Sequence, residues 1–256
     1  MTKGIWQRDE LIIAFNLYCK IPFGRIHNRN SDVIALANAL DRSPSAVSWK
    51  LANFARLDPS LQNRGISGAI HGSKGEVEIW NEFNDNWEEL AFESERLLAQ
   101  VTGQSIEKVA AIVEGDQPLK EGKERDSFIR ARVNQNFFRA SVLAAYDTCC
   151  CITGLPISEL LVASHIVPWA SDPKNRLNPR NGLCLNAIHD RAFDRGLLTI
   201  TQDYKVVLSP RLAAFAEEDS IKDLLIRYDG VRIRLPQRFV PEQSFLEYHN
   251  KVVFSS

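Results

Sequence analysis

Residues 114–125, which read EGDQPLKEGKER, show no hydrophobic periodicity and combine glycine, proline and charged residues. A stretch of this kind is typical of a linker, because it offers no apolar face that could pack. Before it, apolar residues recur at helical spacing, whereas much of the later part consists of short apolar runs broken by turn residues. We therefore predict two domains, residues 1–113 and residues 126–256, which suits a chain of 256 residues.

The first domain is predicted to begin with three short helices, because residues 8–21, 30–41 and 41–57 each carry apolar side chains at helical spacing. Ser43 can cap the third helix, and Pro44 suits its first turn. Helix, short turn and capped helix is the order found in helix-turn-helix domains, whose second helix lies in the DNA major groove. A three-helix cluster that binds no DNA is the alternative, and these residues leave both interpretations open.

The third predicted helix carries the candidate DNA contacts. Val47, Leu51 and Phe54 form its inner stripe, so the opposite face points outward. Small polar and basic side chains on that face suit contacts to base edges and phosphates. The candidate DNA-binding residues on this face and at its edge are Ser45, Ser48, Trp49, Lys50, Asn53 and Arg56.

Charge is unevenly distributed in a chain whose net charge is -1. Residues 1–74 are rich in Lys and Arg, while residues 75–114 hold only Arg96 and Lys108 against a run of glutamates. Basic segments can neutralise phosphates, although a solvated surface explains them equally well. Residues 75–113 are predicted to form amphipathic helices whose acids face solvent and would repel DNA. We assign these helices to a scaffold and, as candidates, to the interface of a homodimer.

The composition favours a soluble cytoplasmic protein without a membrane partner. No apolar run approaches the roughly 20 residues that span a bilayer, and the N-terminal MTKGIWQRDELI has no apolar signal-peptide core. Five cysteines, three of them adjacent at 149–151, argue against a disulfide framework and for a reducing compartment.

Two of the five histidines lie in the stretch 163–196, which reads ASHIVPWASDPKNRLNPRNGLCLNAIHDRAFDRG. His165 and His189 stand on either side of Asn181, which opens an Asn-Gly pair. Taken singly, each has an ordinary explanation, since a lone histidine is commonly a core residue and Asn-Gly is commonly a turn. Together they also fit a metal-dependent site that hydrolyses a phosphodiester bond.

Over residues 125–211 the chain resembles the HNH endonuclease family. His-Ile-x-Pro-Trp, Asn-Gly-Leu and His-x3-Phe-Asp occur in this order at the family's spacing, and the naming residues align as His165, Asn181 and His189. The resemblance implies an α+β fold in which a helical, helix-turn-helix-like module precedes a nuclease domain. That domain is a β-hairpin followed by a helix around one metal ion, the ββα-metal arrangement. The N-terminal part resembles only the modules that accompany such domains.

The same resemblance assigns roles to the three residues. His165 is the general base, a task that suits a neutral imidazole with an ordinary pKa of about 6.5. Asn181 fixes the loop that orients this base, and His189 is a metal ligand. One divalent cation stabilises the charge on the phosphate and the leaving oxygen. We predict Mg²⁺, with Mn²⁺ and Ni²⁺ as alternatives.

Arginines near these residues are candidate DNA contacts, because guanidinium groups bind phosphate oxygens well. Two of them have an alternative role as partners of Asp190 and Asp194. The three candidates are Arg180, Arg191 and Arg195.

The metal's second protein ligand is left open by a departure from the family pattern. Ser164 occupies the position before the base that many relatives give to Asp or His. The candidates for the missing ligand are the carboxylates of Asp194 and Asp190, the amide of Asn186 and Ser164 itself, and water could also fill the position.

A second departure concerns cysteine. Some relatives bind structural zinc through two Cys-x2-Cys pairs, and this chain has no such pair. We therefore expect no structural zinc and interpret Cys149, Cys151 and Cys184 as buried thiols. The remaining histidines, His27, His71 and His249, have no comparable context and are interpreted as structural or surface residues.

Taken together, the sequence predicts a metal-dependent endonuclease that cuts double-stranded DNA, in a restriction or defence system. A homodimer is predicted, because a single HNH site cuts one strand. Two alternatives remain: a nicking or non-specific nuclease whose N-terminal module serves assembly only, and a DNA-binding regulator whose nuclease site is inactive.

Overall fold

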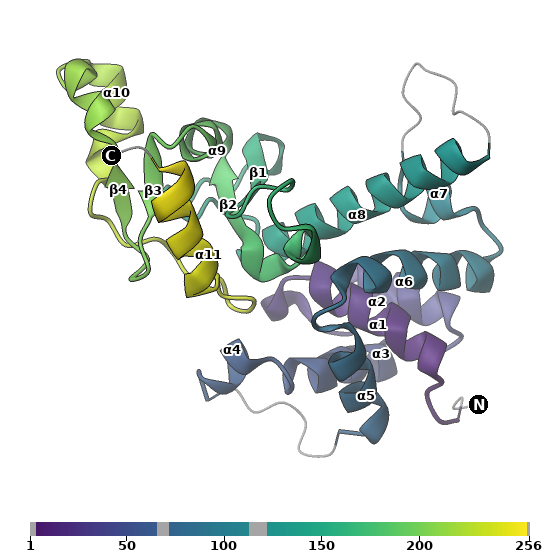
Figure 1. The fold of residues 1–256 in the computed structure, drawn as a ribbon. Coiled ribbons are helices and arrows are strands. Elements are labelled where there is room, and N and C mark those ends of the chain that lie inside the picture. The colour runs from purple at the N-terminus through teal and green to yellow at the C-terminus, as the bar shows by residue number, and fades with distance from the viewer. Residues whose placement is uncertain (1–3, 66–71, 113–121, 255–256) are drawn as a thin grey trace. The chain divides into compact units, whose positions relative to one another are not determined.

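The computed structural model describes residues 4–65, 72–112 and 122–254 (Figure 1). Contacts divide the chain into two compact units, Met1–Ser141 and Val142–Ser256. Helices predominate among the described residues, and the strands form two small antiparallel pairs in the second unit. The predicted α+β class is confirmed. Within these ranges, no helix is both long and apolar enough to cross a bilayer.

The division between the units falls within helix α8, Lys123–Ala145. Residues 114–121 of the predicted linker lie outside the described residues, as does His71, and residues 122–125 form a turn and the start of α8. Most of α8 joins the first unit because it packs there: the ring of Phe137 lies 6.3 Å from that of Trp87. The predicted second domain therefore begins with a helix whose contacts belong largely to the first unit.

The first unit is helical throughout its described part. Helix α1 is central and packs against α3, α5 and α6. The core between them is aromatic, with the ring of Phe15 lying 4.8 Å from that of Phe54 and 5.3 Å from that of Trp80. Before α8 the helices are α1 (Arg8–Lys20), α2 (Ser31–Ala39), α3 (Pro44–Ala55), α4 (Pro59–Gln62), α5 (Lys74–Phe83), α6 (Trp87–Thr102) and α7 (Ile106–Val109), with a 3₁₀ turn at Phe23–Arg25.

Local sequence signals set the ends of α2 and α3. The side chain of Asn30 accepts hydrogen bonds from the backbone of Asp32 and Val33 and so caps α2. Ser43 caps α3 by accepting from the backbone N–H of Ala46, and Pro44 lies in its first turn, as predicted. These caps fix the helical phase that buries the predicted inner stripe of α3.

Acidic residues of α5 and α6 pair with basic residues from the first helices. Glu76 is fully buried and forms an ion pair with Lys50, which is itself 8% exposed. Glu95 is also buried; it forms an ion pair with Lys20 and accepts a hydrogen bond from Asn16. The expectation that the acids of residues 75–113 face solvent is wrong for these two glutamates. Much of the apparent charge separation in the sequence is therefore neutralised inside the unit.

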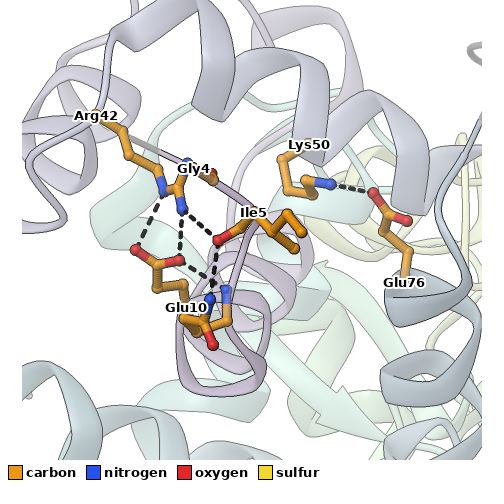
Figure 2. A network of polar contacts seen from close by, with 7 residues as sticks. Gly4, Ile5, Glu10, Arg42, Lys50 and Glu76 are labelled. Atoms are coloured by element: carbon orange, nitrogen blue, oxygen red, sulfur yellow. Dashed lines mark hydrogen bonds and ion pairs between the residues drawn. The ribbon is translucent and has the colours of Figure 1, made fainter. Parts of the chain in front are cut away.

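The segment before α1 is held by a third ion pair, between Arg42 and Glu10 (Figure 2). The guanidinium of Arg42 binds the carboxylate of Glu10 at 2.7 Å and donates to the carbonyls of Gly4 and Ile5. The centroid of the Trp6 indole lies 4.2 Å from the same guanidinium. It lies 5.2 Å from the ammonium of Lys50. Cation–π and ionic contacts thus join the N-terminal segment to α1, to the turn between α2 and α3, and to α3.

The second unit contains two strand pairs. Strands β1 and β2 are antiparallel, and His165 at the end of β1 stands opposite Gly182 at the start of β2. Helix α9 follows β2 directly and packs on β1, β2 and β3. The elements are β1 (Leu161–His165), β2 (Gly182–Asn186), α9 (Ala187–Asp194), β3 (Leu198–Ile200), β4 (Val206–Leu208), α10 (Asp219–Leu224) and α11 (Gln243–Tyr248), with a π-helical turn at His249–Val253.

We predict that Lys50→Met lowers the free energy of unfolding by about 3 kcal/mol, because it leaves the buried Glu76 carboxylate without its cation. Burial disfavours the charge of Glu76, but hydrogen bonds from Lys50, Ser73 and Asn53 outweigh this effect and hold its pKa at about 2. Denaturant unfolding followed by circular dichroism measures the change.

The matched control is Arg8→Met, which breaks an ion pair with Glu82 whose two side chains are about half exposed. This change is expected to cost about 1 kcal/mol or less. Equal losses in the two variants would show that the Lys50–Glu76 pair adds nothing by being buried.

Candidate functional site

A cavity of about 470 Å³ opens between β1, the loop that follows it and α9. It is wholly contained in the second unit. Its lining brings together an imidazole, two carboxylates and two guanidinium groups, together with a serine and an indole. These residues are His165, Asp190, Asp194, Arg191, Arg195, Ser164 and Trp169.

His165 occupies the last position of β1, and its ring is fixed by a backbone contact. Its Nε2 atom lies 2.9 Å from the carbonyl oxygen of Arg176. Because a carbonyl can only accept, Nε2 carries the proton and the lone pair of the neutral ring is on Nδ1. Burial lowers the pKa of His165 below its ordinary value, which favours the neutral ring. The side chain is therefore prepared to accept a proton at Nδ1.

Asn181 holds the loop that connects His165 to β2. Its side-chain oxygen accepts from the backbone N–H of Val167 at 2.8 Å, and its amide nitrogen donates to the carbonyls of Val167 and Asn175. Its own carbonyl accepts from Ile166. The buried amide thus fixes both ends of the loop.

Asp190 and Asp194 lie one turn apart on α9 and share the cavity. Burial raises the pKa of Asp190, and the charge of Asp194 raises it further, although Ser164 and Arg191 act in the opposite direction. Burial also raises the pKa of Asp194, against the charges of Arg191 and Arg195. Burial disfavours the ionised form of both carboxylates, so a cation bound in the cavity would stabilise that form.

Ser164, in β1, adds a third oxygen-bearing side chain to the cavity. Its side chain is buried, and its hydroxyl has no hydrogen-bond partner of ordinary geometry among the described residues. It nevertheless lies near enough to Asp190 to favour the charged form of that carboxyl. Carboxylate and hydroxyl oxygens suit hard divalent cations, so this set fits such an ion. In residues 4–65, 72–112 and 122–254, however, no three His, Cys, Asp or Glu side chains cluster as a ready metal site.

The structure does not bring His189 and Asn186, two predicted metal ligands, to this cavity. The Nε2–H of His189 donates to the carbonyl of Leu224 at 2.8 Å, and its Nδ1 accepts from Asn186 at 3.0 Å. The oxygen of Asn186 caps α9 by accepting from the backbone of Ile188 and His189. Both side chains are engaged in holding the helix. The carbonyl partner of His189 lies 35 residues further along the chain, so no local motif could have revealed it.

Of the three arginines predicted to contact phosphate, two line the cavity and one does not. Arg191 and Arg195 are exposed and line the cavity. Arg180 lies outside the lining and packs its guanidinium 5.8 Å from the ring of Phe239.

All five cysteines are free thiols. Cys19, Cys150, Cys151 and Cys184 are buried, while Cys149 is partly exposed. The sulfur of Cys150 accepts a hydrogen bond from the backbone of Asn186 and so packs beneath the hairpin.

Helix α3 of the first unit presents only part of its predicted DNA-binding face. Ser45 is exposed, Ser48 is partly exposed, and Trp49 is 64% exposed. Lys50 and Asn53 instead direct their side-chain nitrogens to Glu76. Arg56 is half-buried, and its guanidinium packs so closely on Gly72 that an added Cβ there would clash with it.

His249 supports α9 through Phe193, which does not line the cavity. Its ring stacks on Phe193 with a centroid distance of 3.6 Å and an interplanar angle of 9°. Its Nδ1 accepts from the hydroxyl of Thr199, and its Nε2–H donates to the carbonyl of Phe193. Burial lowers the pKa of His249 to about 4. His249 is thus a structural residue, as predicted.

This burial makes the stability of α9 dependent on pH. Histidine in an unfolded chain has a pKa of about 6.5, so between pH 6.5 and pH 4 the unfolded state binds a proton that the folded state does not. The stabilisation that depends on neutral His249 is therefore fully present above pH 6.5 and is lost as the pH falls toward 4. We expect the opening free energy of α9 to fall by about 2 kcal/mol between pH 7 and pH 5.

Hydrogen exchange of peptides that cover α9 and β3 measures this fall, after correction for intrinsic exchange rates. His249→Gln keeps a donor and an acceptor at this position but cannot titrate, so its fall should be smaller by most of that amount. An equal fall in both proteins would assign the pH dependence to other groups.

Comparison with protein families matches residues 150–201 to the family described as HNH endonuclease. The matched segment contains the hairpin, α9 and β3, and therefore the cavity described above. A search of curated proteins finds no match to the chain.

Proposed function

With residues 150–201 identified as an HNH endonuclease domain, which supports phosphodiester hydrolysis, we propose that this chain is a metal-dependent DNA endonuclease of a restriction or defence system. The observation that carries the proposal is the hydrogen bond from His165 Nε2–H to the carbonyl of Arg176. The ring is thereby held in its neutral Nε2–H form, and His165 lines a cavity that also holds two carboxylates. A general base beside oxygen ligands for a cation is the arrangement that phosphodiester hydrolysis needs.

In the proposed mechanism, His165 accepts a proton from the attacking water at Nδ1. The neutral form is available near pH 7 because burial holds the pKa of His165 below its ordinary value. Asn181 acts indirectly, since it fixes the loop on which the carbonyl partner of His165 stands. Arg191 and Arg195 bind phosphate oxygens and orient the scissile strand.

The residues that would hold the cation are Asp190, Asp194 and Ser164. When bound, a divalent cation neutralises charge on the scissile phosphate and on the leaving oxygen. A set of oxygen ligands favours Mg²⁺ or Mn²⁺ over softer ions. The hydrogen bonds of His189 support a different role, in which it secures α9 to the carbonyl of Leu224.

Double-stranded DNA is the proposed substrate, with the exposed part of α3 as the reading surface and a cytoplasmic homodimer as the acting form. A second candidate is a nuclease without sequence preference whose first unit serves assembly. The engagement of Lys50 and Asn53 with Glu76 favours this candidate, because it removes two side chains from the surface that would read bases.

We predict that His165→Ala lowers the cleavage rate of a defined plasmid by at least about 100-fold, the usual contribution of a general base. DNA affinity, measured by gel shift, should change little because the substitution removes no charge from the neutral ring. His27→Ala is the matched control, since His27 is exposed on the other unit. Full activity of His165→Ala would reject the mechanism.

The same digests separate the two candidate functions. Discrete, reproducible bands from the wild-type protein indicate sequence reading. A smear supports the nuclease without sequence preference.

We further predict that Asp190→Asn and Asp194→Asn each raise the Mg²⁺ concentration for half-maximal cleavage by about tenfold or more. His189→Gln should lower thermal stability and leave the Mg²⁺ requirement unchanged, because its partners are Leu224 and Asn186. A Mg²⁺ requirement that rises only in His189→Gln would assign the cation to the histidine instead.

A further inference from the structure

Four contacts join His165, Arg176 and Trp169 in a closed circuit. His165 Nε2–H donates to the carbonyl of Arg176, and Arg176 Nε–H donates to the carbonyl of Trp169 at 2.9 Å. The guanidinium of Arg176 lies 5.4 Å from the centroid of the Trp169 indole. The indole closes the circuit by standing perpendicular to the imidazole, at 88° and 5.5 Å between centroids.

We infer that Trp169 and Arg176 are positioning residues that hold the His165 ring with Nε2 toward the loop and Nδ1 as its basic nitrogen. Neither side chain takes part in proton transfer, and the inference rests on the proposed role of His165 as the base. An imidazole turned over about its Cβ–Cγ bond would place Cε1 where Nε2 lies and so lose the hydrogen bond to the Arg176 carbonyl. The perpendicular indole restricts this rotation sterically, and the edge-to-face contact favours one ring orientation.

Trp169 shows little sign of a role in the core. Its side chain is 36% exposed and lines the cavity, and its backbone carbonyl already serves Arg176. An exposed aromatic side chain contributes less to stability than a buried one, so its removal should affect the site more than the fold. Its position in the cavity also allows a direct contact with DNA, an outcome that the experiment below distinguishes.

The test compares Trp169→Ala, Trp169→Phe and Arg176→Ala with the wild-type full chain. We expect kcat to fall between about 10- and 100-fold in Trp169→Ala, as for a misplaced catalytic group, with KM for DNA unchanged. Trp169→Phe should recover most of the rate, because it restores an aromatic face beside the imidazole. Phe215→Ala is the matched control, since Phe215 is an exposed aromatic residue outside the cavity.

A second measurement is independent of cleavage. Nitrogen-15 NMR of the histidine side chains reports which ring nitrogen of His165 carries the proton. The wild-type protein should show Nε2–H alone, while Trp169→Ala and Arg176→Ala should show a mixture of the two tautomers. Thermal unfolding checks that each variant is folded, and Arg176→Ala carries the test if Trp169→Ala does not fold.

Three results would overturn the inference or its premise. Unchanged kcat and a single Nε2–H tautomer in Trp169→Ala would show that the ring needs no such support. A raised KM with unchanged kcat would mean that the indole binds DNA instead. Activity in His165→Ala would reject the proposed function itself, whatever the tryptophan variants show.

Discussion

The hydrogen bonds of the Asn181 side chain are the constraint on which the proposed catalytic arrangement depends. One amide bonds to the backbone of Val167, just after β1, and to the carbonyl of Asn175, across the loop. Arg176, whose carbonyl accepts from His165, is the next residue along the chain. Because buried amides make these bonds with defined geometry, the position of that carbonyl, and with it the orientation of the imidazole, follows from Asn181.

The resemblance of the sequence to the HNH family predicted the hairpin, the helix after it and the loop-setting role of Asn181. It could not separate His189 from Asp190. Adjacent helical residues point about 100° apart, so the phase of α9 decides which of them faces the cavity. That phase is set by the Asn186 cap and by the distant Leu224 carbonyl. Asp190 and Asp194, four residues apart, share the face that the cavity uses.

The uneven distribution of charge along the sequence was also misinterpreted, because its role depends on contacts between distant residues. The basic start of the chain and its acidic middle look like a DNA-attracting part and a DNA-repelling part. In the folded first unit, Lys50 and Lys20 form ion pairs with Glu76 and Glu95. Ion pairs between residues far apart in the chain leave no local pattern in the sequence. We therefore predicted a surface position for side chains that the fold places in buried ion pairs. The cap of α3 was predictable because Ser43 accepts a hydrogen bond from a residue only three positions further along the chain.

The central claim is that the cavity between β1 and α9 binds a divalent cation through oxygen ligands beside a histidine base. Anomalous scattering from crystals of His165→Ala soaked in Mn²⁺ tests it most directly. We expect a single strong peak in contact with the carboxylates of Asp190 and Asp194, with His189 still bonded to the Leu224 carbonyl. A peak on the imidazole of His189, with that bond broken, would contradict it.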